Sequence, residues 1–318
     1  MNKAYKFRIY PDAEQTTIIE KTFGCVRFVY NIFLNQRIEK YCNEKESIGY
    51  TKQQNQLPEL KKELIWLKEV DSTSLQMSLR NLDRAFQNFF RDKSIGFPKF
   101  KSKRNNKKSY TSNYVNGNIE VKKNKVRLPK LGFVKASVHR YVEGKVINAT
   151  INKNCSGKYF VSIITEFETE VYQESENKIG IDLGIIHFAV LSTGEKIDNP
   201  KYLSNTLKKL IKAQQKLSRK DKGSNNRNRQ RIKVAKIHEK IACQREYFLH
   251  SQSKRLVDEN QVICLEDLSI KNMMKSSLKT GTTLAQKIAD VSWYKFYSQL
   301  EYKANWQNKK ILKINRWY

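Results

Sequence analysis

Two carboxylates lie within the two most apolar strand-like runs of the chain. Asp182 stands in Ile-Gly-Ile-Asp-Leu-Gly-Ile, and Glu266 ends Val-Ile-Cys-Leu-Glu. A charge on or beside a buried strand is costly unless it is paired or binds a metal ion. Two acids from different strands that meet across a sheet can hold Mg²⁺ beside a phosphodiester. A salt-bridged residue at a strand end is the alternative for each acid taken singly.

The Gly-Ile-Asp-Leu-Gly string also occurs in sugar-kinase and chaperone-type ATPases, where it contacts phosphate. In those proteins small hydroxyl residues usually follow the string, whereas Ile185-Ile186-His187 follow it here. The chain has 12 glycines and no Gly-Gly pair, so further glycine-rich nucleotide loops are not evident. The pattern therefore favours metal ligation over ATP binding.

Basic residues are concentrated in two stretches of the chain. Residues 101–130 contain ten Lys and Arg and one acid, and residues 201–240 contain fourteen and two. Such clusters neutralise phosphates, and an interleaved tyrosine can stack on a base, although a solvated surface is the alternative. The candidate nucleic-acid contacts are Lys99, Lys101, Lys103, Arg104, Lys107, Lys108 and Tyr110, followed by Lys208, Lys212, Arg219, Arg227, Arg229 and Arg231.

The overall composition supports a polyanionic partner. The 318 residues include 61 Lys and Arg against 31 Asp and Glu, which gives a formal net charge of +30. Nucleic acid is the natural partner for this charge, and a membrane surface is the weaker alternative because no basic amphipathic helix stands out. No apolar run is long enough to span a membrane, and no signal peptide precedes the first strand. These features predict a protein of the cytosol that associates with the nucleoid.

The pattern of apolar residues predicts the elements that carry these groups. Strict alternation over 3–10 predicts a strand, and apolar residues at helical spacing predict a helical block over about 12–93. Short alternating segments over 109–169 predict a small barrel, which the lone first strand must join. Apolar strands at 178–191 and 262–268 alternate with helices in the remainder. The five cysteines are widely spaced, which favours buried free thiols.

Several motifs together resemble one family over essentially the whole chain. They are Lys-Ala-Tyr-Lys-Phe-Arg-Ile-Tyr-Pro (3–11), Phe-Gly-Cys-Val-Arg-Phe-Val-Tyr-Asn (23–31), Gly-Phe-Pro-Lys-Phe-Lys-Ser-Lys (96–103), Arg-Leu-Pro-Lys-Leu-Gly (127–132), Gly-Ile-Asp-Leu-Gly (180–184), Leu-Glu-Asp-Leu (265–268) and Ser-Trp-Tyr-Lys-Phe (292–296). These segments, which follow one another in the same order as in the family, resemble TnpB proteins. TnpB proteins are transposon-encoded RNA-guided nucleases related to type V CRISPR effectors.

This resemblance implies an α+β multidomain fold. Residues 1–11 and 105–175 would form a wedge-type β-barrel, with a helical recognition domain over 12–104 inserted between them. Residues 176–318 would form a RuvC-like domain of RNase H fold. The implied partners are a guide RNA and a target double-stranded DNA, with one monomer for each guide RNA.

The chain departs from the family pattern at its C-terminal end. In the family, the segment matching Ile311–Tyr318 continues into a Cys-x-x-Cys zinc module and a helix with a third catalytic Asp, whereas this sequence stops at Tyr318. Asp182 and Glu266 would then form a partial or vestigial catalytic site that holds Mg²⁺ weakly, if at all. No zinc ligands are expected.

The departure favours one function and leaves two alternatives. We expect a guide-directed DNA-binding protein that is deficient in cleavage and represses transcription. The alternative is an RNA-guided, Mg²⁺-dependent endonuclease seen as an incomplete chain, and a third is a protein that only shelters its own RNA. Gln76 and Arg80, one helical turn apart, are candidates for reading the short motif beside the target, although ordinary surface positions are an equal alternative.

Overall fold

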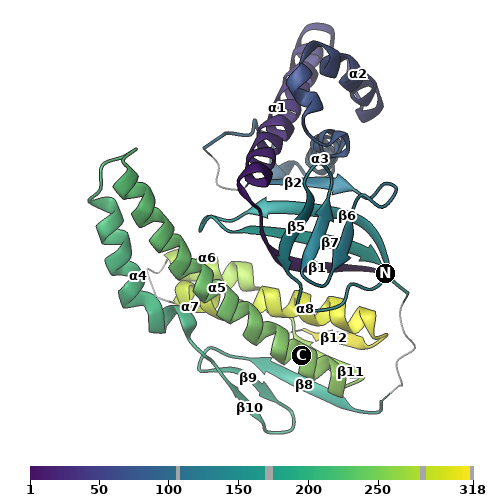
Figure 1. Ribbon diagram of the computed structural model, residues 1–318. Helices are drawn as coiled ribbons and strands as arrows, with labels where there is room; N and C mark the ends of the chain where they lie inside the picture. Colours follow the sequence, from purple (N-terminus) through teal and green to yellow (C-terminus); the bar gives the residue numbers. More distant parts are fainter. Residues whose placement is uncertain (105–107, 169–174, 280–283, 316–318) are drawn as a thin grey trace. The chain divides into compact units, whose positions relative to one another are not determined.

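The computed structural model describes residues 1–104, 108–168, 175–279 and 284–315. The chain divides into two compact units, Met1–Glu168 and Thr169–Tyr318, each with its own hydrophobic core (Figure 1). The described helices include none that is long and apolar enough to cross a membrane.

The first unit contains a sheet of seven strands in the order β2-β6-β7-β1-β5-β4-β3. The strands are β1 (Asn2–Tyr10), β2 (Lys108–Asn113), β3 (Glu120–Lys122), β4 (Lys125–Leu128), β5 (Gly132–Ser137), β6 (Lys145–Lys153) and β7 (Tyr159–Glu166). The pairing predicted for the first strand is confirmed, because β1 lies antiparallel between β7 and β5, with Phe7 opposite Val161 and Ile9 opposite Ala136. Chain segments far apart in sequence therefore build one sheet.

The helices of the first unit lie in sequence between β1 and β2. They are α1 (Ala13–Glu44), α2 (Tyr50–Glu63), the 3-10 turns η1 (Ile65–Lys68) and η2 (Lys93–Ile95), and α3 (Ser72–Arg91). Asp12 begins α1 with a capping box: its carboxylate accepts from the Gln15 amide, and the Gln15 side chain accepts from the Asp12 amide. The sequence thus predicted the start of α1 correctly.

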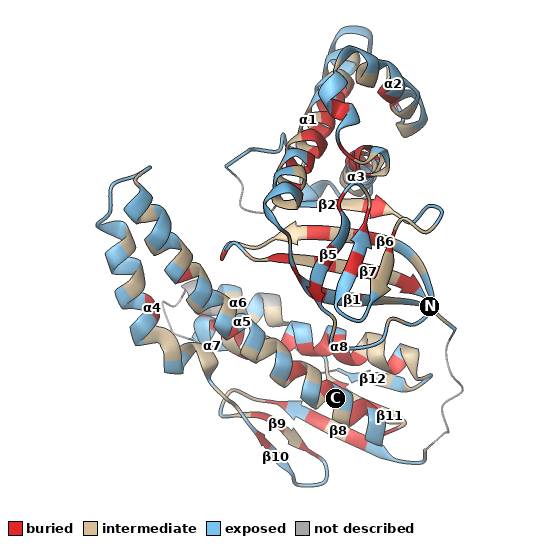
Figure 2. Cartoon of the chain, in the orientation of Figure 1, coloured by how far each residue is buried: buried red, intermediate tan, exposed pale blue. Residues whose placement is uncertain are grey.

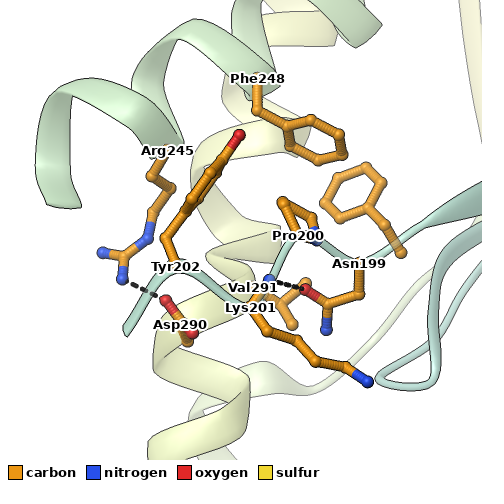
Figure 3. A pocket seen from close by; sticks show the side chains of 9 residues that line it. Asn199, Pro200, Lys201, Tyr202, Arg245, Phe248, Asp290 and Val291 are labelled. Atoms are coloured by element: carbon orange, nitrogen blue, oxygen red, sulfur yellow. Dashed lines mark hydrogen bonds and ion pairs between the residues drawn. The ribbon is translucent and has the colours of Figure 1, made fainter. Parts of the chain in front are cut away.

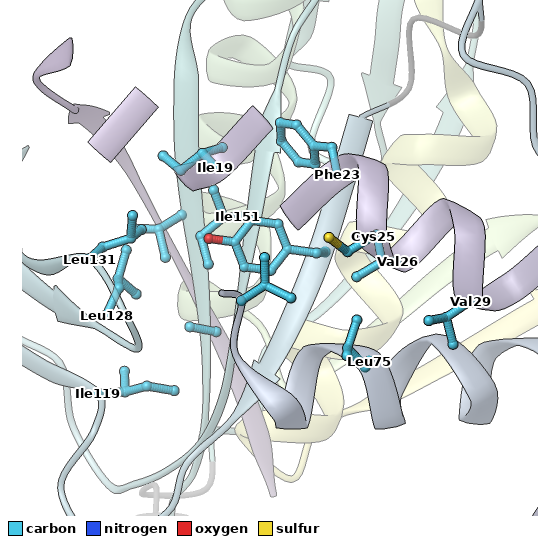
Figure 4. Packing of buried hydrophobic residues seen from close by; sticks show 14 of the residues in the cluster. Ile19, Phe23, Cys25, Val26, Val29, Leu75, Ile119, Leu128, Leu131 and Ile151 are labelled. Carbon is cyan, nitrogen blue, oxygen red and sulfur yellow. The ribbon is translucent and has the colours of Figure 1, made fainter. Parts of the chain in front are cut away.

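The core of the first unit joins these helices to the sheet. Ile19 and Phe23 of α1 and Leu75 of α3 pack against strand residues such as Ile151 (Figure 4). Buried positions alternate along β1 and β7 and recur along one side of α1 (Figure 2). Burial of this apolar surface is the main term that stabilises the unit.

The second unit contains a sheet of five strands in the order β10-β9-β8-β11-β12. The strands are β8 (Lys178–Leu183), β9 (His187–Leu191), β10 (Lys196–Asp198), β11 (Val262–Glu266) and β12 (Lys310–Ile314). β8, β9 and β10 form an antiparallel meander, whereas β11 runs parallel to both β8 and β12. The two strands that carry the candidate carboxylates are therefore neighbours.

The described residues of the second unit also form helices, some of which pack on its sheet. They are α4 (Tyr202–Ser218), α5 (Asn225–Glu259), α6 (Ile270–Lys279), α7 (Leu284–Val291) and α8 (Trp293–Trp306). Figure 1 shows α5 and α8 along the sheet, and residues of both helices share a core with Ile181 and Leu265. α7 and α8 are separated by Ser292, whose φ of 58° is left-handed.

The five cysteines are free, as predicted, but most of them are not buried. Only Cys25 is buried; Cys264 is half-buried, and the other three thiols are exposed. The expectation of buried thiols is therefore wrong for Cys42, Cys155 and Cys243, which lie at surface positions.

Candidate functional site

The fold places Asp182 and Glu266 on neighbouring strands. In the parallel pair of β8 and β11, Cys264 lies opposite Gly180 and Leu265 opposite Ile181. The next residue on each strand is Asp182 and Glu266. Because neighbouring strands lie about 4.8 Å apart, this register brings the two carboxylates to the same level of the sheet.

Both carboxylates lie on the face of the sheet opposite the hydrophobic core. Ile181 and Leu265 point into the core, whereas Asp182 is exposed and Glu266 is half-buried. The sequence expectation of an expensive buried charge is therefore wrong for Asp182. The two acids line a shallow groove, whose other walls are Gly180, Ile181, Val190, Leu191, Ser192, Cys264, Leu265 and Ile314.

Two glycines shape the strand that carries Asp182. A Cβ on Gly184 would lie 2.9 Å from the His187 carbonyl oxygen, which real Cβ atoms essentially never approach so closely. The turn into β9 is closed by the Gly184 amide, which donates to the Phe188 carbonyl at 3.2 Å. The amide of Gly180 donates to the Ser192 hydroxyl at 3.0 Å. The close approach to the His187 carbonyl therefore gives Gly184 a structural reason in this fold, whereas a Cβ on Gly180 would make only ordinary contacts with Ser192.

The strand end at Glu266 is held by backbone hydrogen bonds. The Glu266 carbonyl accepts from the Tyr297 hydroxyl of α8 and from the Leu268 amide. The Asp267 amide donates to the Ile314 carbonyl of β12 at 2.8 Å. Burial, together with nearby carboxylates, raises the pKa of Tyr297 to about 12, so its hydroxyl remains a donor at neutral pH. These bonds fix the backbone from which the Glu266 side chain projects.

Two carboxylate side chains are a donor set that suits Mg²⁺. This ion takes oxygen ligands, keeps several water molecules and is commonly bound through one or two carboxylates. Within the described parts of the chain, no group of three or more His, Cys, Asp or Glu is placed to hold a metal ion. Asp182 and Glu266 are therefore the candidate ligands that the structure brings together.

A third acid of this unit, Asp290 of α7, is committed to a structural role. Its side chain is only 9% exposed, and the Arg245 guanidinium of α5 lies 2.6 Å from it (Figure 3). The same carboxylate accepts from the Leu203 amide, in the first turn of α4, at 3.1 Å. An acid at a helix N-terminus is favourable, because the first amides of a helix have no intrahelical partners. Asp290 thus joins three helices.

The basic candidates of the first unit fall into two groups. Lys99, Lys103 and Arg104 are exposed. Lys101, which is also exposed, and Lys108, which is half-buried, contact protein groups. The Lys101 ammonium lies 3.9 Å from the centroid of the Tyr30 ring, and its backbone bonds the Asn31 side chain. The Lys108 ammonium lies 2.7 Å from the Glu20 carboxylate.

Tyr110 is part of the hydrophobic core. Its side chain is 6% exposed, and its ring packs edge-to-face on Phe23 with centroids 5.6 Å apart. The prediction that Tyr110 stacks on a base is therefore wrong, because its ring presents no face to a ligand. Lys107 lies outside the described residues.

The helical pair of α4 and α5 carries a groove lined with lysines. Lys208 and Lys212, both candidates from the sequence, lie in it. The described residues that line it include no acid, and its remaining walls are Lys209, Ala213, Lys216, Gln230, Lys233, Lys236 and Ile237. The sequence reasoning missed four of these lysines. The spacing of 208, 212 and 216 at successive turns of one helix would have identified Lys216.

The arginines of this pair do not all remain available. Arg219, Arg229 and Arg231 are exposed. Arg227 is half-buried, and its guanidinium donates to the carbonyls of Leu217 and Lys220 at 2.8 and 2.9 Å. It therefore satisfies carbonyls at the end of α4, which is an ordinary structural role for a cation at a helix C-terminus.

The two candidates for reading a target motif lie on α3. Gln76 is half-buried, and Arg80 is exposed one turn further along. The Arg80 Nε donates to the Tyr50 hydroxyl of α2 at 3.1 Å, and its guanidinium lies 5.7 Å from the centroid of that ring. Tyr50 therefore orients Arg80, and a role in reading bases stays a prediction.

Comparisons with known proteins agree on one family. Residues 162–277 match a family described as "Probable transposase", and residues 1–46, which here form β1 and α1, match its "Helix-turn-helix domain". A protein of Streptomyces pristinaespiralis named "Putative RNA-guided DNA endonuclease" is 37% identical, with 100% of this chain and 78% of that protein aligned. InsQ of Escherichia coli, with the same description, is 33% identical over 98% of this chain and 80% of InsQ.

Among solved structures, a Cas12f1–guide RNA–target DNA complex aligns with 99% of this chain and 85% of its own. The sequence identity is 12% and the TM-score 0.35, a likeness too low to support an assignment of fold. The relatives at 37% and 33% identity, together with the two family matches, are sufficient without it. The chain therefore belongs to the TnpB family.

Proposed function

We propose that this protein is an RNA-guided DNA endonuclease, with a guide RNA and a target double-stranded DNA as its partners. The proposal is supported by the names of the relatives that match essentially the whole chain. Those relatives favour cleavage over the cleavage-deficient repressor that the sequence alone suggested. The observation that carries the proposal is the placement of Asp182 and Glu266 side by side on parallel strands.

Asp182 and Glu266 would hold Mg²⁺, which supplies charge stabilisation for the attacking and leaving oxygens of a phosphodiester. The two side chains project from the exposed face of the sheet into one groove, where a phosphate backbone could approach them. The strand order β10-β9-β8-β11-β12, with a meander followed by parallel strands, supports an RNase H-like domain over residues 176–318.

The remaining surfaces would bind nucleic acid. The net charge of +30 and the lysine-lined groove of α4 and α5 support contacts to a phosphate backbone, of RNA or of a heteroduplex. The pairing of β1 with β5 and β7 supports a wedge-type barrel built from residues 1–11 and 105–175, with the recognition helices over 12–104 inserted. We place one protein chain on each guide RNA.

The test is cleavage by the purified RNA–protein complex. The chain would be co-expressed with its flanking DNA, the bound RNA sequenced, and the matching duplex incubated with the complex in Mg²⁺. We expect cleavage, and Asp182→Asn should lower its rate by about 10²- to 10³-fold while DNA retention is unchanged. Asp198→Asn, an exposed acid on β10 of the same sheet, is the matched control.

Each other outcome has a definite meaning. Wild-type complex that retains the duplex without cutting it would overturn the endonuclease and support a repressor that acts by occupancy. Complex that carries RNA but retains no matching duplex would support a protein that only shelters its RNA. Cleavage that persists in Asp182→Asn would remove that residue from the site.

A further inference from the structure

The first unit carries a cluster of phenylalanines at the end of α3. The Phe86 and Phe97 rings meet edge-to-face with centroids 5.4 Å apart, and Phe89 meets Phe97 in the same way at 5.5 Å. Phe90 lies 6.2 Å from Phe86 and 5.4 Å from Phe89. We call these four residues the aromatic platform.

The chain beyond α3 is folded to complete this platform. Asp92 accepts from the Ser94 amide at 2.9 Å, which turns the chain through η2. Gly96 then adopts φ 81° and ψ 161°, a region that is essentially restricted to glycine. This conformation returns Phe97 to α3, which accounts for Gly96 and Phe97 at these positions.

The platform is open to solvent on its outer side. Phe86 is its buried member, whereas Phe90 is 70% and Phe97 46% exposed. Large exposed apolar patches on soluble proteins commonly mark interaction sites, because burying them from water is favourable. Its exposed charged neighbours in the sequence are three cations, Arg91, Lys93 and Lys99, and one acid, Asp92.

We propose that the aromatic platform stacks the bases of a single-stranded segment of nucleic acid. Planar rings beside cationic side chains suit single strands, in which bases stack on the rings while phosphates contact Lys and Arg. An apolar protein partner fits less well, because it would cover Arg91 and Lys93 without supplying charge. The inference deepens the nucleic-acid binding of the proposed function and rests on it. Phe90 and Phe97 thus take the role that the sequence assigned to Tyr110.

The test uses the full chain and single-stranded oligonucleotides that contain 5-iodouridine, which crosslinks to aromatic side chains stacked on it. We expect irradiation to crosslink the peptide that contains Phe90 or Phe97. Phe90→Leu, which keeps the apolar surface but removes the planar ring, should weaken binding by about 5-fold or more. Tyr247→Leu, a change at an exposed ring of α5, is the matched control.

Salt dependence separates stacking from charge. Phe90→Leu should weaken binding equally at all salt concentrations, whereas Lys99→Gln should reduce the slope of log K against log salt by about 0.7. Equal affinity and unchanged crosslinks in Phe90→Leu would overturn the platform while leaving the proposed function intact. Failure of the wild-type chain to bind any single strand would count against both.

The platform must also be distinguished from an interface between two copies of the chain. Light scattering of the wild-type chain and of Phe90→Leu would show whether the ring supports a second copy of the chain. A dimer that dissociates in the variant, together with unchanged affinity for single strands, would overturn the proposal and assign the platform to a protein interface.

Discussion

Glu20 of α1 should contribute strongly to the stability of the first unit. Its carboxylate lies 2.7 Å from the ammonium groups of both Lys108 and Lys153, and it accepts from the Tyr159 hydroxyl at 3.0 Å. These partners lie on β2, β6 and β7, so one side chain ties the first helix to three strands. The expected perturbation is Glu20→Gln, which keeps the shape but removes the charge.

The size of the effect follows from the pKa of Glu20. Burial alone would raise this pKa, but hydrogen bonds from Lys108, Lys153 and Tyr159 outweigh it and lower the pKa from 4.5 to about 2. This difference corresponds to about 3 kcal/mol, and we take about 2 kcal/mol because the side chain is 32% exposed and partly screened. The contribution is present above about pH 4.5 and is lost as the pH falls towards 2.

The assay is denaturant unfolding of the wild-type chain and of Glu20→Gln at several pH values. At pH 7 the variant should lose about 2 kcal/mol, and the difference should shrink as the pH falls from 4.5 towards 2. Glu39→Gln makes the same charge change at an exposed position of α1. A loss no larger than that of Glu39→Gln, or one independent of pH, would refute the reasoning.

The same variant tests the role of Lys108. If this lysine mainly pairs with Glu20, as the structure indicates, Glu20→Gln frees two cations and should leave nucleic-acid affinity unchanged or increase it. A loss of affinity in a variant that remains folded would show that the ion-paired geometry itself contributes to binding.

Three further changes should report on the second unit. Asp290→Asn breaks the pair with Arg245 and should lower the free energy of unfolding by about 3 kcal/mol, measured by denaturant titration, while binding of nucleic acid persists. Gly184→Ala forces a methyl group against the His187 carbonyl and should lower the melting temperature, at a cost of about 1–3 kcal/mol. Burial lowers the pKa of Lys303 to about 8, so wild-type stability should rise between pH 8 and pH 10 by about 1 kcal/mol after screening. Lys303→Met should remove that rise in unfolding titrations at the two pH values.

Periodicity predicted much of the fold. Alternation in residues 3–10 identified β1, and the need of a lone strand for partners predicted its pairing across the inserted helices. The interruption at Ser292 was not predictable, because apolar residues continue at helical spacing through it and the change is confined to one left-handed residue. Local patterns specify elements, whereas such a break depends on tertiary packing.

The sequence predicted some features of the candidate site correctly and others wrongly. The apolar surroundings of Asp182 placed it on a strand, but they did not show that it faces away from the core, which depends on the register of alternation. Tyr110 was misjudged for the same reason. Tyr110 alternates with the exposed Ser109 and the half-buried Thr111 along β2, so its ring points inward although Lys108 lies two residues away.

The net charge counts all cations alike, whereas the contacts of each cation show which ones are held by other groups of the protein. Lys108 and Arg227 are held by Glu20 and by the end of α4, and Lys101 lies on a tyrosine ring. The lysines of the α4–α5 groove, such as Lys208 and Lys212, line a surface without acids among its described residues. A charge of +30 therefore indicates the class of partner, whereas the direction of each side chain decides where that partner can bind. Substitutions of groove lysines should consequently weaken binding of nucleic acid without loss of stability. Substitution of Arg227 should lower stability without weakening that binding.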